Sequence, residues 1–208
     1  MMLTVQILVV VLYVTIVLEL TVFHVPSVAS SLNIWKPREE VLKFYSKKYA
    51  SIFQMARWKK FCLFILPLGM IYLTYFFPSF LYFESPIDLM FLFQPNTIIM
   101  LIGLVTMLVG RFITFSSVLT IRKKNEQKGN SFTLHTEGGF SKTRNPGLLG
   151  LYLFLFGIWL ILPSTYFLLG IMFYMGYMHF KVLMEEDFLS NRYGESYAKY
   201  LAATKRYF

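Results

Sequence analysis

The chain has 208 residues, of which 56% are hydrophobic and 19% are aromatic, a larger apolar share than soluble domains carry. Its 20 Lys and Arg outnumber its 11 Asp and Glu, but these bases cluster beside apolar runs, which predicts contacts with lipid headgroups and no nucleic-acid partner. The single cysteine, Cys62, excludes an internal disulfide and a multi-cysteine metal site. The high apolar share of the composition predicts an integral membrane protein.

Residues 3–25 form a continuous apolar run that is long enough to cross the ~30 Å hydrocarbon core of a bilayer. No basic residue precedes the run and no small-residue cleavage site follows it, which favours a retained helix over a removable signal peptide. Glu19 lies within the run, where an unpaired acid is costly. We expect Glu19 either to pair with Arg111 of a later span or to contact a ligand.

The segment 26–60 combines eight bases with apolar side chains at helical spacing, and Pro37 suits a first helical position. This pattern predicts an amphipathic helix in the membrane interface, with its bases on the lipid headgroups. The alternative is a solvated connector. The apolar face consists of Leu42, Tyr45, Tyr49, Ile52, Phe53 and Ala56.

Four further apolar runs predict membrane spans, the first of them bent at Pro67. The segments between the spans differ in charge, and those rich in Lys and Arg are expected to be cytoplasmic. The sequence therefore predicts an all-α protein with five transmembrane helices, an outside N-terminus and a cytoplasmic C-terminus. It forms one membrane domain, 1–208, in which 1–130 hold three spans and the interfacial helix and 131–208 hold a hairpin. The four runs are residues 61–83, 97–121, 146–162 and 164–186.

The last two spans are separated by Pro163, so they should form a helical hairpin with both polar ends on one membrane face. At ~1.5 Å per residue its arms are roughly 25 and 34 Å long, which places Glu185 and Glu186 about 9 Å beyond the start of the first arm. A polar cosubstrate bound there would lie beside a partner dissolved in the membrane.

The start of the hairpin has a structural and a functional interpretation. Asn145 is a favoured N-cap and Pro146 a favoured first helical residue, so they can simply begin the helix. The same helix N-terminus, with Arg144 beside it, can also bind a carboxylate or phosphate. The glycines that follow suit either close packing against the next span or approach of a ligand to the backbone. They are Gly147, Gly150 and Gly157.

The end of the hairpin carries Glu185, Glu186 and Asp187. They can be a solvated helix end, with Lys181 paired to Glu185, but acids are unfavourable at a helix C-terminus, which indicates another use. None of the three histidines, His24, His135 and His179, is spaced to bind a metal together with these acids, so we predict no metal.

Together the two ends of the hairpin resemble the isoprenylcysteine carboxyl methyltransferase and phospholipid methyltransferase family. That pattern has Gly-x-Phe/Tyr, an Arg-His/Asn-Pro step, a later Gly, then Glu-Glu-x-x-Leu and Gly-x-x-Tyr-x-x-Tyr. In this sequence the matching residues are Gly138, Phe140, Arg144, Asn145, Pro146, Gly150, Glu185, Glu186, Leu189, Gly194, Tyr197 and Tyr200.

The resemblance implies S-adenosylmethionine bound at the cytoplasmic end of the hairpin and a lipophilic methyl acceptor, either a prenylcysteine-like carboxylate or a lipid amine. Arg144 and Glu186 are the implied catalytic residues. Two positions depart from the family pattern: Leu148 where Tyr is common, and Phe132 where His is frequent, with His135 nearby. The implied cofactor-binding residues are His135, Gly138, Phe140, Arg144, Asn145, Pro146, Gly150, Glu185, Glu186 and Tyr197.

The acceptor decides whether a general base is needed. A carboxylate acceptor needs none at neutral pH, whereas an amine or thiol must lose a proton, which Glu186 or His135 could receive. Two other functions compete with methyl transfer: a membrane reductase of the steroid-reductase type that uses NADPH, and a non-catalytic membrane interaction protein.

Overall fold

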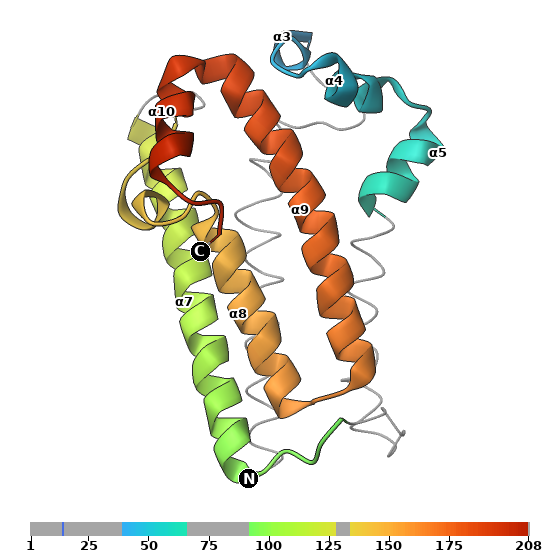
Figure 1. Cartoon of the computed structure of the whole chain (residues 1–208), viewed down its shortest axis with the longest axis vertical. Helices are drawn as coiled ribbons and strands as arrows, with labels where there is room; N and C mark the ends of the chain where they lie inside the picture. Colours follow the sequence, from blue (N-terminus) through green and yellow to red (C-terminus); the bar gives the residue numbers. More distant parts are fainter. Residues whose placement is uncertain (1–13, 15–38, 66–91, 128–133, 208) are drawn as a thin grey trace. The chain divides into compact units, whose positions relative to one another are not determined.

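The computed structural model describes residue 14 and residues 39–65, 92–127 and 134–207. The chain divides into two compact units, residues 1–67 and 68–208. The described residues form helices and no strand, apart from one isolated parallel bridge, so the all-α prediction is confirmed for them (Figure 1). The predictions for the first span, for Glu19 and its pairing with Arg111, and for Pro67 lie outside the described residues.

The first unit contains short helices where one interfacial helix was predicted. The prediction of a single continuous helix is wrong, because Ser46 and Met55 have extended backbones with ψ of 158° and 155°. The amphipathic pattern itself is confirmed within one of these helices, whose Tyr49, Ile52 and Phe53 are buried. Ala56, predicted on that apolar face, is exposed. The elements are α3 (Glu39–Leu42), α4 (Lys47–Gln54), α5 (Arg57–Lys60) and the π-helix η2 (Phe61–Ile65).

The exposed bases of this unit are expected to bind anionic lipid. Lys43, which precedes α4, and Lys47 and Lys48 in its first turn are exposed, and a base near an anionic surface contributes about 1 kcal/mol. Replacing all three with Gln should reduce retention of phosphatidylglycerol, measured by native mass spectrometry, and leave cofactor affinity unchanged. A large loss of cofactor affinity would contradict an interfacial role.

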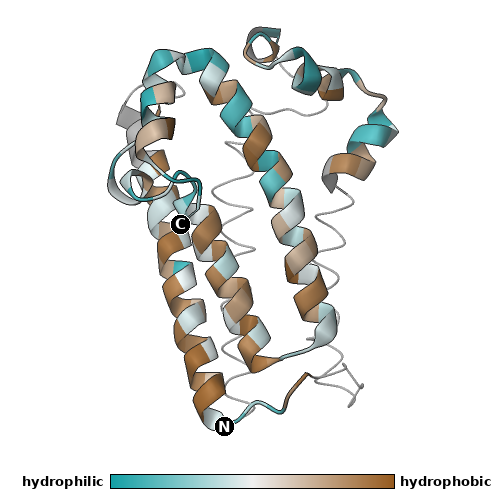
Figure 2. Cartoon of the chain, in the orientation of Figure 1, coloured by the Kyte–Doolittle hydropathy of each residue, from teal (hydrophilic) through white to brown (hydrophobic). Residues whose placement is uncertain are grey.

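The described residues of the second unit form three long helices and two short ones. Of the described helices, α7 and α9 are long and apolar enough to cross a membrane, and α8 is a shorter apolar helix. Figure 2 shows their apolar residues along the middle and lower parts of these helices, with polar residues toward α10. Helices therefore form where the last three spans were predicted. The elements are α7 (Thr97–Gln127), η3 (Gly138–Ser141), α8 (Pro146–Ile161), α9 (Thr165–Tyr193) and α10 (Glu195–Ala203).

Helices α7 and α8 lie side by side in backbone contact (Figure 1). A Cβ added at Gly110 would lie 2.5 Å from the carbonyl oxygen of Gly150, and one added at Gly157 would lie 2.6 Å from that of Gly103. Small residues at both ends of this contact allow the close approach, as is common between membrane helices. The predicted packing of the α8 glycines against the following span is therefore wrong, because the partner is α7.

The connection from α8 to α9 is the predicted turn at Pro163. Ser164 caps α9 by accepting a hydrogen bond from the Tyr166 amide at 3.2 Å. Helix α9 continues past the predicted end at residue 186 to Tyr193, and Gly194, with φ of +51°, separates it from α10. Because L side chains rarely adopt this conformation, glycine allows the sharp change of direction. The chain then returns from α10 toward the start of α8.

Candidate functional site

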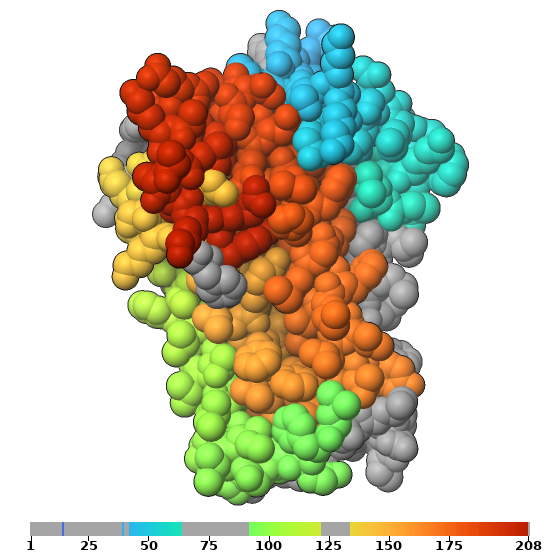
Figure 3. Space-filling model, viewed as in Figure 1, coloured from blue at the N-terminus to red at the C-terminus, as the bar shows by residue number. Residues whose placement is uncertain are grey.

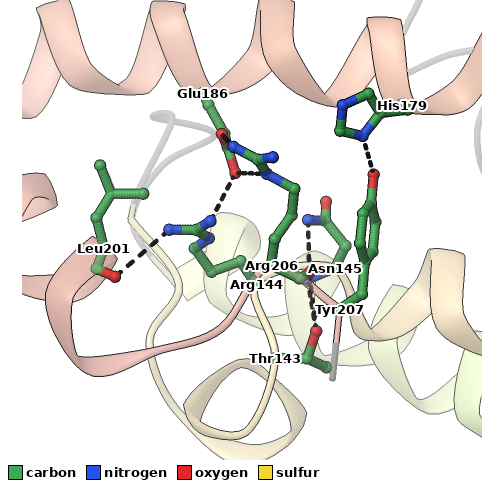
Figure 4. Close-up of polar contacts among 8 residues, drawn as sticks. All are labelled: Thr143, Arg144, Asn145, His179, Glu186, Leu201, Arg206 and Tyr207. Carbon is green, nitrogen blue, oxygen red and sulfur yellow. Dashed lines mark hydrogen bonds and ion pairs between the residues drawn. The ribbon is translucent and has the colours of Figure 1, made fainter.

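Three segments meet at the start of α8: the residues before its first turn, the C-terminal part of α9, and residues 204–207, here called the tail. Figure 3 shows the C-terminal residues lying over the start of α8 and against α9. Figure 4 shows the side chains of Arg144, Glu186 and Arg206 pointing toward one another. The site thus combines residues from distant parts of the sequence.

The tail is attached to the start of α8 through the backbone. Thr143 and Lys205 form a parallel bridge, and the Arg144 amide donates to the Lys205 carbonyl at 2.9 Å. The Arg206 carbonyl accepts from Thr143 Oγ1 at 3.0 Å and from Asn145 Nδ2 at 3.1 Å. Asn145 and Pro146 begin α8 as predicted, but the Asn145 side chain makes no capping bond. The Asn145 side chain instead donates its hydrogen bond to the Arg206 carbonyl of the tail.

Glu186 lies between two guanidinium groups. Arg206 donates from Nε to Oε1 at 2.9 Å and from Nη2 to Oε2 at 2.7 Å. Arg144 Nη2 lies 3.2 Å from Oε1. The side chains of Arg144 and Glu186 are 11% and 13% exposed, so within the cluster of Arg144, Glu186 and Arg206 these two are largely shielded from water. The prediction that the hairpin brings residues 144 and 186 together is confirmed.

The cluster has one more positive than negative charge, and Arg144 retains an unused donor. Its Nη1 lies 3.5 Å from the Leu201 carbonyl oxygen, at the limit of a hydrogen bond. Its Nε is buried and has no hydrogen-bond partner within the described part of the chain. Because a buried unsatisfied donor is unfavourable, the arrangement suits an added anion.

An aromatic group adjoins the cluster on the α9 side. Tyr207 and His179 Nδ1 form a hydrogen bond at 3.0 Å (Figure 4). The Tyr207 ring centroid lies 6.3 Å from that of Tyr152, which makes an edge contact with Tyr174 at 6.2 Å. Burial raises the pKa of the Tyr207 hydroxyl, so this group is neutral at physiological pH. These rings give the site an apolar side next to its charged one.

The predicted residues of the 3-10 helix and of α10 support the site. Phe140 accepts a hydrogen bond at its carbonyl from Tyr200 Oη at 2.6 Å, and its ring lies 5.9 Å from that of His135. Tyr197 is 1% exposed, and burial raises the pKa of its hydroxyl. Gly138 has φ of +64°, and a Cβ there would meet no atom within 4 Å in the part of the chain that the structure describes. Gly138 therefore contributes to the site through the positive φ of its backbone, which L side chains rarely adopt.

Gly150 and Glu185, both predicted to bind the cofactor, lie outside the cluster and outside the site contacts described above. Gly150 lies in the α7 contact, where an added Cβ would be 2.6 Å from the Gly110 carbonyl oxygen, so helix packing accounts for this glycine. Glu185 is exposed and, among the described ion pairs, has none with Arg144 or Arg206. The structure thus separates the acidic pair into two different environments.

Arg206 and Tyr207 were not predicted as site residues. The family pattern ends at Tyr200, and the sequence predicts that the bases of the tail are topology determinants and lipid-headgroup contacts. A parallel bridge of one residue pair leaves no periodic signal in the sequence. The sequence does place a further arginine, Arg206, after α10, and a reversal of the chain direction at α10 brings it within reach of the acidic pair.

The comparison with protein families agrees with the two motifs. Residues 98–196 match the phospholipid methyltransferase family, a segment that begins in α7, includes Arg144 and Glu186, and ends in α10 before the tail. No curated protein and no solved structure matches the chain. Through residues 98–196 the chain is similar to the phospholipid methyltransferase family, which confirms the resemblance drawn from the two motifs.

Proposed function

We propose that this protein is an integral membrane methyltransferase that uses S-adenosylmethionine to methylate a lipophilic acceptor dissolved in the bilayer. The observation that carries the proposal is the 3.2 Å pairing of Arg144 with Glu186. Both residues lie within the segment that matches the methyltransferase family. The distribution of bases supports five spans, an outside N-terminus and a cytoplasmic site.

The donor set of the cluster fits S-adenosylmethionine. That cofactor carries a carboxylate, an ammonium and ribose hydroxyls, so it presents groups of both charges. The free Nε of Arg144 and the excess positive charge suit the carboxylate, and Glu186 suits the ammonium or a hydroxyl. When bound, the cofactor would supply an activated methyl group on its sulfonium.

The protein's own residues would contribute position and exclusion of water. The low exposure of Arg144 and Glu186 strengthens their electrostatic interactions with a bound ligand. The α7–α8 contact holds the start of α8, and with it Arg144, in a defined place. Orientation of this kind can supply a large part of the rate of a displacement reaction.

The geometry favours one class of acceptor, and the family favours another. Both oxygens of Glu186 accept from Arg206, so Glu186 would have to exchange a guanidinium partner before it could take a proton from an amine. This favours a carboxylate acceptor, which needs no base. A lipid amine is the second candidate, because the matching family is that of phospholipid methyltransferases.

Arg144→Ala is expected to lower activity and cofactor affinity at least tenfold, about 1.4 kcal/mol or more. The variant removes the unused donor and one guanidinium of the cluster but leaves the backbone contacts with the tail. Isothermal titration with S-adenosylhomocysteine, together with methylation assays on prenylcysteine and phosphatidylethanolamine, measures both effects.

The matched control is Lys142→Ala, which removes an equal charge from an exposed position in the same loop. Its affinity and activity should equal those of the unchanged protein. Unaltered cofactor binding in Arg144→Ala would show that Arg144 has only a structural role.

In sealed vesicles, turnover should require S-adenosylmethionine on the cytoplasmic side. Binding of NADPH in place of S-adenosylhomocysteine would favour the reductase. Binding of neither ligand would favour a non-catalytic membrane interaction protein.

A further inference from the structure

Arg206 is the tail residue that contacts the proposed site most directly, and it lies beyond the segment that matches the family. Its guanidinium forms two hydrogen bonds to Glu186, one to each carboxylate oxygen, at 2.9 and 2.7 Å. Its side chain is 34% exposed, whereas that of Glu186 is 13% exposed. A parallel two-bond pair of this kind has a fixed geometry.

The two arginines are bound to Glu186 unequally. Arg144 reaches the same carboxylate only through Nη2, at 3.2 Å, and keeps its Nε free within the described structure. Arginine–carboxylate pairs frequently form the two-bond arrangement, which uses both carboxylate oxygens. Here Arg206 occupies them. Arg144 contacts Glu186 only at Oε1, which it shares with Arg206.

We propose that Arg206 is a positioning residue of the cofactor site. By holding both oxygens of Glu186, it prevents Arg144 from closing onto that carboxylate and leaves Arg144 Nε available to the carboxylate of the cofactor's amino-acid end. This inference rests on the proposed use of S-adenosylmethionine. It assigns a role to the tail that is separate from its backbone contacts with Thr143 and Asn145.

Those backbone contacts allow the side chain to be tested alone. The Arg206 carbonyl, which holds the start of α8, is retained in any substitution. In Arg206→Met we expect Arg144 to pair with Glu186 through two bonds and to lose its free donor. The consequence should be restricted to ligands that carry the amino-acid end.

The experiment compares two ligands by isothermal titration. S-adenosylhomocysteine has the amino-acid end, and 5′-methylthioadenosine has the same nucleoside without it. Arg206→Met should weaken binding of S-adenosylhomocysteine by about tenfold or more and that of 5′-methylthioadenosine by less than about threefold. Arg206→Lys should give an intermediate loss, since an ammonium keeps the charge but cannot form two parallel bonds.

Lys199→Met is the charge-matched control, because Lys199 is 77% exposed and pairs with Glu195 at the surface. It should leave both affinities unchanged. Equal weakening of both ligands in Arg206→Met, or none in either, overturns the positioning role while the proposed function stands. An unchanged protein that binds neither ligand overturns the proposed function itself. If Arg206→Met does not fold, the affinity ratio in Arg206→Lys decides: a ratio equal to that of the unchanged protein overturns the role.

Discussion

Glu186→Gln is expected to lower the free energy of unfolding by about 2 kcal/mol and to remove measurable binding of S-adenosylhomocysteine. The substitution leaves two guanidinium groups together, without the carboxylate that both contact. Removing one partner of a buried ion pair costs several kcal/mol, and the partial exposure of Arg206 reduces that figure. The midpoint of thermal unfolding in detergent, followed by intrinsic fluorescence, should fall by roughly 5 °C.

Glu195→Gln is the matched control for stability. Glu195 and Lys199 are also paired, at 2.9 Å, but their side chains are 83% and 77% exposed. A surface pair of this kind contributes about 0–1 kcal/mol, so the midpoint should scarcely change. Adding Arg206→Met to Glu186→Gln should restore part of the lost stability, because it removes one of the uncompensated charges. Equal midpoints for the two Gln variants would show that Glu186 is not a buried partner.

The second large effect is expected in the α7–α8 contact. Gly150→Ala would place a methyl group 2.6 Å from the Gly110 carbonyl oxygen and 2.7 Å from the Thr114 amide nitrogen. Both atoms belong to the backbone, so the helices must separate. Overpacking of this kind costs about 1–3 kcal/mol. We expect a lower midpoint of thermal unfolding and weaker cofactor binding, since Arg144 precedes the helix that is displaced.

Gly176→Ala provides the comparison within α9. A Cβ at Gly176 meets no atom of the described residues within 4 Å. Alanine is a better helix former than glycine by up to about 1 kcal/mol, so this variant should be as stable as the unchanged protein or more so. If Gly150→Ala were equally stable, α7 and α8 would not be in backbone contact.

The sequence predicted the central pair of the site because a helical hairpin has few possible geometries. Two apolar runs separated by Pro163 must return to the same face, so Arg144 and Glu186 had to lie at the same end. The ion pair at 3.2 Å agrees with this. The start of α8 at Asn145 and Pro146 also followed from local preferences alone.

Residues whose partners lie far away in the sequence could not be predicted in this way. The tail joins the site through one parallel bridge and the side chain of Arg206, neither of which follows a period. The interfacial segment has a helical period throughout, but the extended backbones of Ser46 and Met55 divide it. Periodicity predicts which face is apolar and does not predict where a helix breaks.

The partner of α8 did have a signal in the sequence. Gly103 and Gly110 are spaced as Gly150 and Gly157 are, and an antiparallel pairing aligns the two sets. Proximity in the sequence favours α9 as the partner of α8, whereas the shared glycine spacing favours α7.

This contact between glycines affects how the protein responds to temperature. Helices that associate within a bilayer are held together by dispersion and by weak Cα–H···O contacts, since no water is released when they meet. The hydrophobic stabilisation of a soluble core weakens on cooling. The α7–α8 pair is in backbone contact at Gly110 and Gly150. We therefore expect its association not to weaken on cooling. It should stay joined in the cold and keep Arg144 in place there.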